Sequence, residues 1–140
     1  MKKILILNSN YYKDISKNLL LNAKKKLIQS KFSVNVFEVP GVYEIPIAIR
    51  KYINRYDGFV ALGCVIKGET PHFNFICSSV FTSILDLSVK YNKPIGNGII
   101  TALNKNQAKK RSSINSKKTN KGSEASNAVI MILKNGPKKN

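Results

Sequence analysis

The stretch Gly58–Ile66 (GFVALGCVI) is an almost unbroken apolar run near the middle of the sequence. A strand with one face in water alternates apolar and polar residues, whereas a strand covered by helices on both faces is apolar throughout. We therefore expect Gly58–Ile66 to form a central strand of a parallel sheet.

Strand-like and helix-like patterns alternate on both sides of this run. Short aliphatic runs predict further strands at Ile4–Leu7, Val34–Val39 and Pro94–Thr101. Apolar residues at helical spacing predict helices at Asp14–Ser30, from Glu44 onward, up to about Tyr91 after a turn at Lys67–Pro71, at Asn104–Ser113 and at Ser123–Leu133. Such alternation implies right-handed crossovers, so we expect an α/β fold with a four-stranded parallel sheet and helices on both faces.

The apolar faces of three of these helices are expected to pack on the sheet. The expected core residues are Ile45, Ile49 and Ile53 in the second helix, Phe75, Ile76, Val80, Ile84 and Leu87 in the third, and Ala125, Ala128, Val129 and Ile132 in the last.

The length of 140 residues allows one domain with a hydrophobic core and is too short for two ordinary ones. Hydrophobic residues make up 43% of the chain, which argues against disorder. We therefore expect a single domain over residues 1–140, with a frayed tail from about Lys134.

The first residues and the two cysteines indicate the compartment. A basic pair and a short apolar stretch open the chain as in a signal peptide, but polar Asn8 interrupts the stretch after four residues. No apolar run reaches membrane-spanning length, so we expect a cytoplasmic protein with no membrane partner. Cys64 and Cys77 lack the spacing of a zinc site or a disulfide framework and are interpreted as small buried hydrophobic residues.

The chain carries 24 basic and 7 acidic residues, which give a net charge of +17. Such an excess makes nucleic-acid or anion binding the first hypothesis. Residues 103–140 hold ten basic residues and one acidic residue, and the remaining excess is spread over residues 1–102. Solvated lysines explain this distribution as well as a binding face does. A basic α/β module that binds nucleic acid through Lys105–Lys121 is therefore one alternative.

Ligands of open α/β sheets bind outside the carboxyl ends of the strands. In this sequence that rule selects four loops, which are Asn8–Tyr12, Pro40–Glu44, Lys67–His72 and Thr101–Asn104. These loops hold most of the chemically unusual residues, and we take them as the candidate site.

His72, the only histidine, follows a turn at the predicted start of a helix. Imidazole titrates near neutral pH, and a helix N-terminus disfavours its cationic form, which leaves a neutral base that accepts a proton. A histidine without function, exposed or in the core, is an equally weighted alternative.

Other residues in these loops have both structural and ligand-binding interpretations. Glu44 suits a first-turn carboxylate beside the helix dipole, so we expect the backbone of Val42–Glu44, rather than its side chain, to contact a ligand. Tyr11 and its neighbour Tyr12 either stack on a planar ring or serve packing. The segment Gly68–Thr70 has N–H groups and a hydroxyl that suit an anion.

Arg111 and Lys121 are the candidate cations for an anionic ligand. The planar fork of Arg111 suits bidentate phosphate binding, and a solvated arginine at a helix C-terminus is an equal alternative. Lys121 leads directly into the last helix, whereas Lys117 and Lys118 are interpreted as parts of a solvated loop.

Four ordered blocks of sequence extend over nearly the whole chain. They are Val39–Pro46 (VPGVYEIP), Ala61–Phe73 (ALGCVIKGETPHF), Pro94–Thr101 (PIGNGIIT) and Asn120–Ala125 (NKGSEA). In order and spacing these blocks resemble the lumazine synthase (6,7-dimethyl-8-ribityllumazine synthase) family. The resemblance implies a flavodoxin-like, three-layer α/β/α domain without cofactor or metal. It also implies a homo-oligomer, expected to be a pentamer with its sites between neighbouring subunits.

The resemblance further implies a transferase of riboflavin biosynthesis. The penultimate step of that pathway condenses 5-amino-6-(D-ribitylamino)uracil with 3,4-dihydroxy-2-butanone 4-phosphate to give the lumazine, phosphate and water. A catalytically inactive relative that binds flavin or lumazine is a further alternative, although a pure binder has no need of a base.

The match to the family's motifs also implies roles for individual residues. His72 would transfer protons, and Tyr11 would stack on the pyrimidine. Val42, Tyr43 and Glu44 would bind the ribitylaminouracil, chiefly through backbone and ribityl contacts, and Cys64, Val65 and Ile66 would line the ring pocket. Glu69 and Thr70 would hold the sugar phosphate together with Arg111, and Asn97 and Lys121 would lie close to the site.

Overall fold

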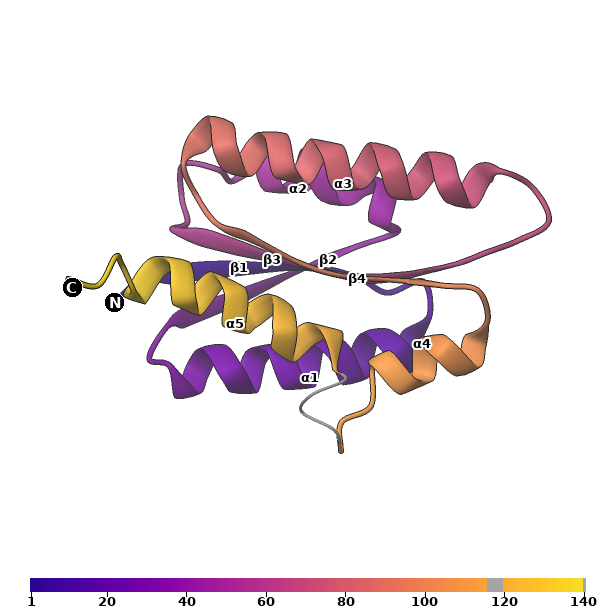
Figure 1. The fold of residues 1–140 in the computed structure, drawn as a ribbon, viewed down its shortest axis with the longest axis horizontal. Helices are drawn as coiled ribbons and strands as arrows, with labels where there is room; N and C mark the ends of the chain where they lie inside the picture. Colours follow the sequence, from indigo (N-terminus) through magenta and orange to yellow (C-terminus); the bar gives the residue numbers. More distant parts are fainter. Residues whose placement is uncertain (116–119, 140) are drawn as a thin grey trace.

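Four parallel strands in the order β2-β1-β3-β4 form the middle layer of the chain (Figure 1). The computed structural model describes residues 1–115 and 120–139. The strands are β1 (Lys3–Ser9), β2 (Ser33–Val39), β3 (Gly58–Ile66) and β4 (Ile95–Ala102). The helices are α1 (Lys13–Gln29), α2 (Ile45–Lys51), α3 (His72–Tyr91), α4 (Lys105–Arg111) and α5 (Lys121–Lys134), with a 3-10 turn η1 (Val42–Glu44) before α2. The expected α/β fold is confirmed, with β3 next to the centre of the sheet.

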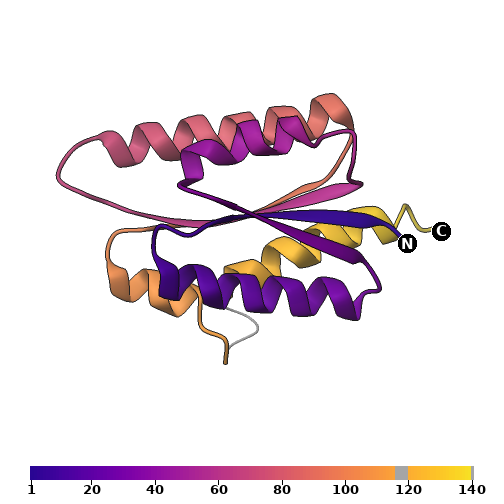
Figure 2. The ribbon, with the colours of Figure 1, turned by 180° about the vertical axis from the view of Figure 1, so that it is seen from behind.

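Helices cover both faces of this sheet. Figures 1 and 2 show α2 and α3 on one face and α1, α4 and α5 on the other. Because successive side chains of a strand point to opposite faces, Ile4 and Ile6 of β1 contribute to the core on the α1 side and Leu5 and Leu7 to the core on the α2–α3 side. This double covering explains why every residue of β3 from its first to Cys64 is buried.

Two glycines allow α5 to pack closely on its neighbours. A Cβ atom at Gly96 of β4 would collide with the carbonyl oxygen of Ala125, and one at Gly122 would collide with the carbonyl oxygen of Leu19 in α1. α5 therefore lies directly against both β4 and α1, which places its first residue, Lys121, beside the edge strand.

The structure corrects several expected boundaries and core residues. α5 begins at Lys121 rather than Ser123, because the side chain of Asn120 caps the helix two residues earlier. Ile132 is 68% exposed and Phe75 is 66% exposed, so neither belongs to the core of the single chain. Ala128 is also exposed, while Ala125 and Val129 are buried as expected.

α3 contradicts the expectation that no apolar segment has membrane-spanning length. Within residues 1–115 and 120–139 it is the one helix that is long and apolar enough to cross a membrane. This assignment uses only the length and the composition of the helix. Its buried residues are Val80 and Ile84. Leu85 and Val89 are exposed, so α3 presents a second apolar face that the described part of the chain does not cover.

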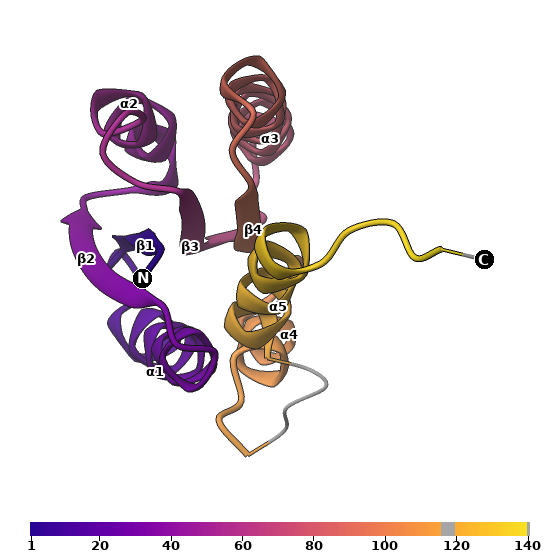
Figure 3. The ribbon, with the colours of Figure 1, turned by 90° about the vertical axis from the view of Figure 1, so that its left-hand side faces the viewer.

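Residues 135–139 follow α5 without a helix or strand and run away from the three layers (Figure 3). The tail thus starts where the sequence pattern ends, and its fraying stays a prediction.

Asn120→Ala is expected to lower the free energy of unfolding by about 1–3 kcal/mol. The Asn120 side chain is fully buried, its Oδ1 accepts a hydrogen bond from the Ser123 N–H at 3.1 Å, and its Nδ2 donates to the Ser113 carbonyl oxygen at 3.2 Å. The variant loses both bonds in a dry environment, which denaturant unfolding measures.

Asn104→Ala is the matched control for this variant. Asn104 caps α4 with the same Oδ1-to-N–H geometry at 3.0 Å, but its side chain is exposed and water replaces the lost bond. Equal losses of stability in the two variants would contradict the buried role of Asn120.

Candidate active site

An open cavity of about 360 Å³ lies at the carboxyl ends of β1 and β3, where the loops gather at the right of Figure 1. Seven predicted site residues line this His72 cavity: Tyr11, Val42, Tyr43, Cys64, Val65, Ile66 and His72. Ser9, Tyr12, Gly41 and Ile76 complete the lining. Three of the four predicted loops therefore meet in one place.

Tyr11 stands at the outer side of the His72 cavity with 74% of its surface exposed. Its ring meets the ring of Tyr12 edge to face, with centroids 5.0 Å apart and an interplanar angle of 77°. Burial raises the pKa of the Tyr12 phenol, and the nearby Cys64 and Tyr11 raise it further. Tyr12 is thus a neutral support for Tyr11, whose exposed ring suits stacking on a planar ligand.

His72 is the first residue of α3, and its side chain is exposed at the mouth of the cavity. The preceding residue, Pro71, is the N-cap and makes no side-chain capping bond. The N–H groups of His72 and Phe73 come too early in α3 to have intrahelical acceptors, whereas the N–H of Asn74 donates to the Pro71 carbonyl oxygen at 3.1 Å. An imidazole in this position reaches both solvent and a ligand in the cavity, as proton transfer requires.

Cys64 lines the cavity as a neutral thiol. Burial raises its pKa to about 11, and the negative charge of Asp14 adds to this effect. At neutral pH the sulfur therefore stays protonated and is a poor nucleophile. Within the described ranges no three His, Cys, Asp or Glu side chains cluster in a way that could hold a metal ion.

A second cavity of about 460 Å³ lies along the free edge of β4 and holds three other predicted residues, Asn97, Arg111 and Lys121. The Nη1 atom of Arg111 donates to the carbonyl oxygen of Thr101 at 3.2 Å, which draws the guanidinium back to the end of β4. The ammonium group of Lys121 lies 3.5 Å from the carboxylate of Glu124 one turn along α5. This Arg111 cavity therefore holds the Arg111 guanidinium together with the Lys121–Glu124 ion pair.

The two cavities share no lining residue. The predicted site is thus divided within one chain, with the aromatic ring and the imidazole in one part and the strong cations in the other. Glu44 lies in neither part and lines a third cavity with Tyr43 and Ile47 between η1, α2 and α3. Glu69 and Thr70 are exposed on the loop that leads directly into His72.

Sequence reasoning missed several lining residues. Ser9 and Ile76 line the His72 cavity, and Phe81 and Glu124 line the Arg111 cavity. Ile76 lies one helical turn after His72 on α3, so helical spacing could have found it. Glu124 could have been found as the acidic residue three positions after Lys121. Ser9 lies in the predicted loop Asn8–Tyr12 but is not distinguished from its neighbours there, and nothing in the sequence distinguishes Phe81.

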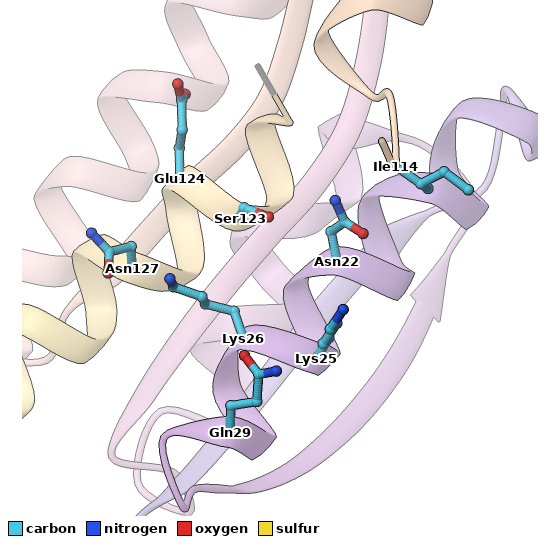
Figure 4. A pocket seen from close by; sticks show the side chains of 8 residues that line it. All are labelled: Asn22, Lys25, Lys26, Gln29, Ile114, Ser123, Glu124 and Asn127. Atoms are coloured by element: carbon cyan, nitrogen blue, oxygen red, sulfur yellow. The ribbon is translucent and has the colours of Figure 1, made fainter. Parts of the chain in front are cut away.

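A further groove of about 280 Å³ lies on the surface between α1 and α5 (Figure 4). Lys26 of α1 extends toward α5, and Lys25 of α1 and Asn127 of α5 also line this groove from exposed positions. Its lining includes Ile114 and Glu124 but none of the predicted site residues. We therefore do not assign the site to this groove.

Comparison with known proteins finds relatives that match nearly the whole chain. The model of a family described as 6,7-dimethyl-8-ribityllumazine synthase matches residues 1–135. A protein of that name from Vesicomyosocius okutanii is 40% identical over 142 residues, which cover 94% of this chain and 84% of the relative. A protein of the same name from Bartonella bacilliformis is 40% identical, over 93% of this chain and 87% of the relative. Another from Paramagnetospirillum magneticum is 32% identical, over 95% of this chain and 93% of the relative.

Proposed function

The chain belongs to the 6,7-dimethyl-8-ribityllumazine synthase family, and we propose that its divided site is completed between neighbouring subunits of a homopentamer. The activity of the family is a transferase reaction of riboflavin biosynthesis, the condensation of 5-amino-6-(D-ribitylamino)uracil with 3,4-dihydroxy-2-butanone 4-phosphate. The observation that carries the proposal is that Arg111 and Lys121 line a different cavity from His72.

Two surface features support the assembly. β4 is an edge strand, so the Arg111 cavity opens on a side where a neighbour can approach. Exposed apolar residues lie on η1, α2 and α3, among them Tyr43, Ile47, Phe75 and Leu85. Apolar surface of this kind is typical of a protein interface. A cyclic arrangement would place the His72 cavity of one subunit against the Arg111 cavity of the next.

In the assembled site the two substrates would occupy the two cavities. The pyrimidine would stack on Tyr11, with the apolar side chains of Val65 and Ile66 around it and the ribityl chain near the backbone of Val42–Glu44. The phosphate of the sugar would bind the Arg111 guanidinium and the Lys121 ammonium of the neighbour, with Asn97 beside them. Glu69 and Thr70, on the loop before α3, would contact the sugar phosphate from the other side.

His72 would act on the protons of this reaction. The amine of the pyrimidine adds to the ketone and water leaves, which forms an imine. A proton then leaves the adjacent carbon, and phosphate departs with the electrons of its C–O bond. An exposed imidazole at the cavity mouth can take up and return these protons. Placing the two substrates side by side supplies a further part of the rate.

The nucleic-acid alternative is not favoured by the comparisons. Its proposed contact segment includes Lys117 and Lys118, which lie outside the described residues. We also propose a cytoplasmic location, which is supported by the two free cysteines and tested by cell fractionation.

The first test is the mass of the assembly as a function of salt. We expect a particle about five times the 15.6 kDa chain mass that dissociates at low salt and is stabilised as sodium chloride is added. Each subunit carries a net charge of +17, so subunits repel one another and salt screens the repulsion. Sedimentation velocity, with lumazine absorbance as the activity readout in the same samples, measures both properties.

A monomer that forms lumazine at full rate would contradict the shared site. An assembly that dissociates as salt rises would contradict the charge argument and indicate that ion pairs hold the subunits together.

A further inference from the structure

Ser9 carries a buried hydroxyl group without a protein partner beside the candidate site. Among the described residues two buried side-chain atoms have no hydrogen-bond partner, Asn8 Oδ1 and Ser9 Oγ. The amide of Asn8 is already held, because its Nδ2 donates to both carboxylate oxygens of Glu38 at 3.0 and 3.1 Å. Ser9 differs because it is 1% exposed and lines the His72 cavity.

The position of the Ser9 side chain is closely defined by its neighbours. Its carbonyl oxygen accepts a hydrogen bond from the hydroxyl of Ser16, which ties the end of β1 to the first turns of α1. A Cβ atom at Gly63 of β3 would lie 3.1 Å from the Cβ of Ser9 and 2.6 Å from Cγ1 of Val42. The absent side chain of Gly63 thus allows Ser9 to lie close to Val42, the first residue of η1.

An unpaired hydroxyl in such a place costs stability, because it has left water without a new partner. A ligand with its own hydroxyl groups removes this cost, since a serine hydroxyl both donates and accepts. The ring of the pyrimidine would lie on Tyr11, which is 74% exposed, whereas Ser9 lines the same cavity and is 1% exposed. A flexible polyol chain joined to that ring is the part of the substrate suited to reach the more deeply buried residue.

We propose that the hydroxyl of Ser9 binds a hydroxyl group of the ribityl chain and thereby selects a ribityl-bearing pyrimidine. The proposal rests on the proposed function, because it takes the pyrimidine substrate to occupy the His72 cavity. It adds a binding residue at the end of β1 to the backbone contacts of Val42–Glu44.

The test compares wild type and Ser9→Ala with two ligands in the assembled protein. The ligands are 5-amino-6-(D-ribitylamino)uracil and the same uracil with a methylamino group in place of the ribitylamino group. Calorimetry under nitrogen is expected to show about three- to tenfold weaker binding of the ribityl compound to Ser9→Ala, the worth of one hydrogen bond. Binding of the methyl compound is expected to stay unchanged. The melting temperature without ligand is expected to stay equal or to rise, because the substitution removes an unpaired polar group.

Ser16→Ala is the matched control. It removes a buried serine hydroxyl that is hydrogen-bonded within the protein, so it lowers the melting temperature. The ratio of affinities for the two ligands is expected to stay at the wild-type value.

Three results for Ser9→Ala would overturn the proposal. Unchanged binding of the ribityl compound to Ser9→Ala means that the hydroxyl does not contact the chain, and equal losses for both ligands mean that it contacts the ring. A lower melting temperature of Ser9→Ala without ligand means that the hydroxyl already has a partner. Lumazine formation by the wild-type protein tests the proposed function separately. A wild-type protein that binds neither ligand would overturn both proposals.

Discussion

Arg111→Ala is expected to lower kcat/KM for the sugar phosphate by about 10²- to 10³-fold, the usual effect of removing one strong donor to a developing negative charge. The phosphate gains charge as its C–O bond breaks, so the guanidinium stabilises the transition state more than the bound substrate. Arg111 is exposed, and with the described residues its side chain makes one hydrogen bond, to the Thr101 carbonyl oxygen. The substitution therefore removes a ligand contact without disturbing the core.

Two further variants show whether the loss belongs to the guanidinium. Arg111→Lys retains the charge but loses the planar fork, so it is expected to recover part of the rate. Lys110→Ala removes an equally exposed charge from the same helix and is expected to stay near wild type. A steady-state rate for Arg111→Ala equal to that of Lys110→Ala would mean that Arg111 does not contact the phosphate.

The layers of the fold follow directly from residue patterns. The limits of β3 agree with the apolar run Gly58–Ile66, because a strand buried on both faces has no polar position to obscure its ends. β1 runs two residues beyond its predicted end at Leu7, since Asn8 and Ser9 are polar and yet buried at the strand end. A pattern read from apolarity alone cannot include such residues.

The wrongly assigned core residues share one physical cause. Phe75 and Ile132 have the apolar character and helical spacing of core residues, yet both are exposed in the single chain. A sequence pattern reports which residues avoid water, but it does not report whether the same chain or a second copy covers them.

The part of the candidate site that lies within one chain was predictable from the sequence. The rule that ligands bind at strand ends selected the loops, and seven predicted residues, His72 among them, do line one cavity. The separation of Arg111 from that group could not be predicted from the sequence. It depends on the side of β4 on which α4 lies, and the turn after β4 determines that side. The role of Ser9 depends on an unpaired hydroxyl, which only atomic positions reveal.

Mixing two impaired variants is expected to restore activity if neighbouring subunits share the site. His72→Ala loses the proton-transfer group, a loss of about 10²-fold or more, and Arg111→Ala loses the phosphate donor. Co-expressed in equal amounts, the variants form rings in which about a quarter of the sites combine an intact His72 with an intact Arg111 from the next subunit. The mixture is then expected to reach about a quarter of the wild-type rate per site, well above either variant alone.

The matched control mixes wild type with the double variant His72→Ala/Arg111→Ala. In a shared site about a quarter of the sites are again intact, so both mixtures have the same rate. If each subunit instead used its own His72 and Arg111, the control mixture would keep about half of the rate and the mixture of single variants would gain nothing. The difference between these two patterns is large because it compares recovery with no recovery. It also holds whatever the exact loss in each variant, since the double variant contains both.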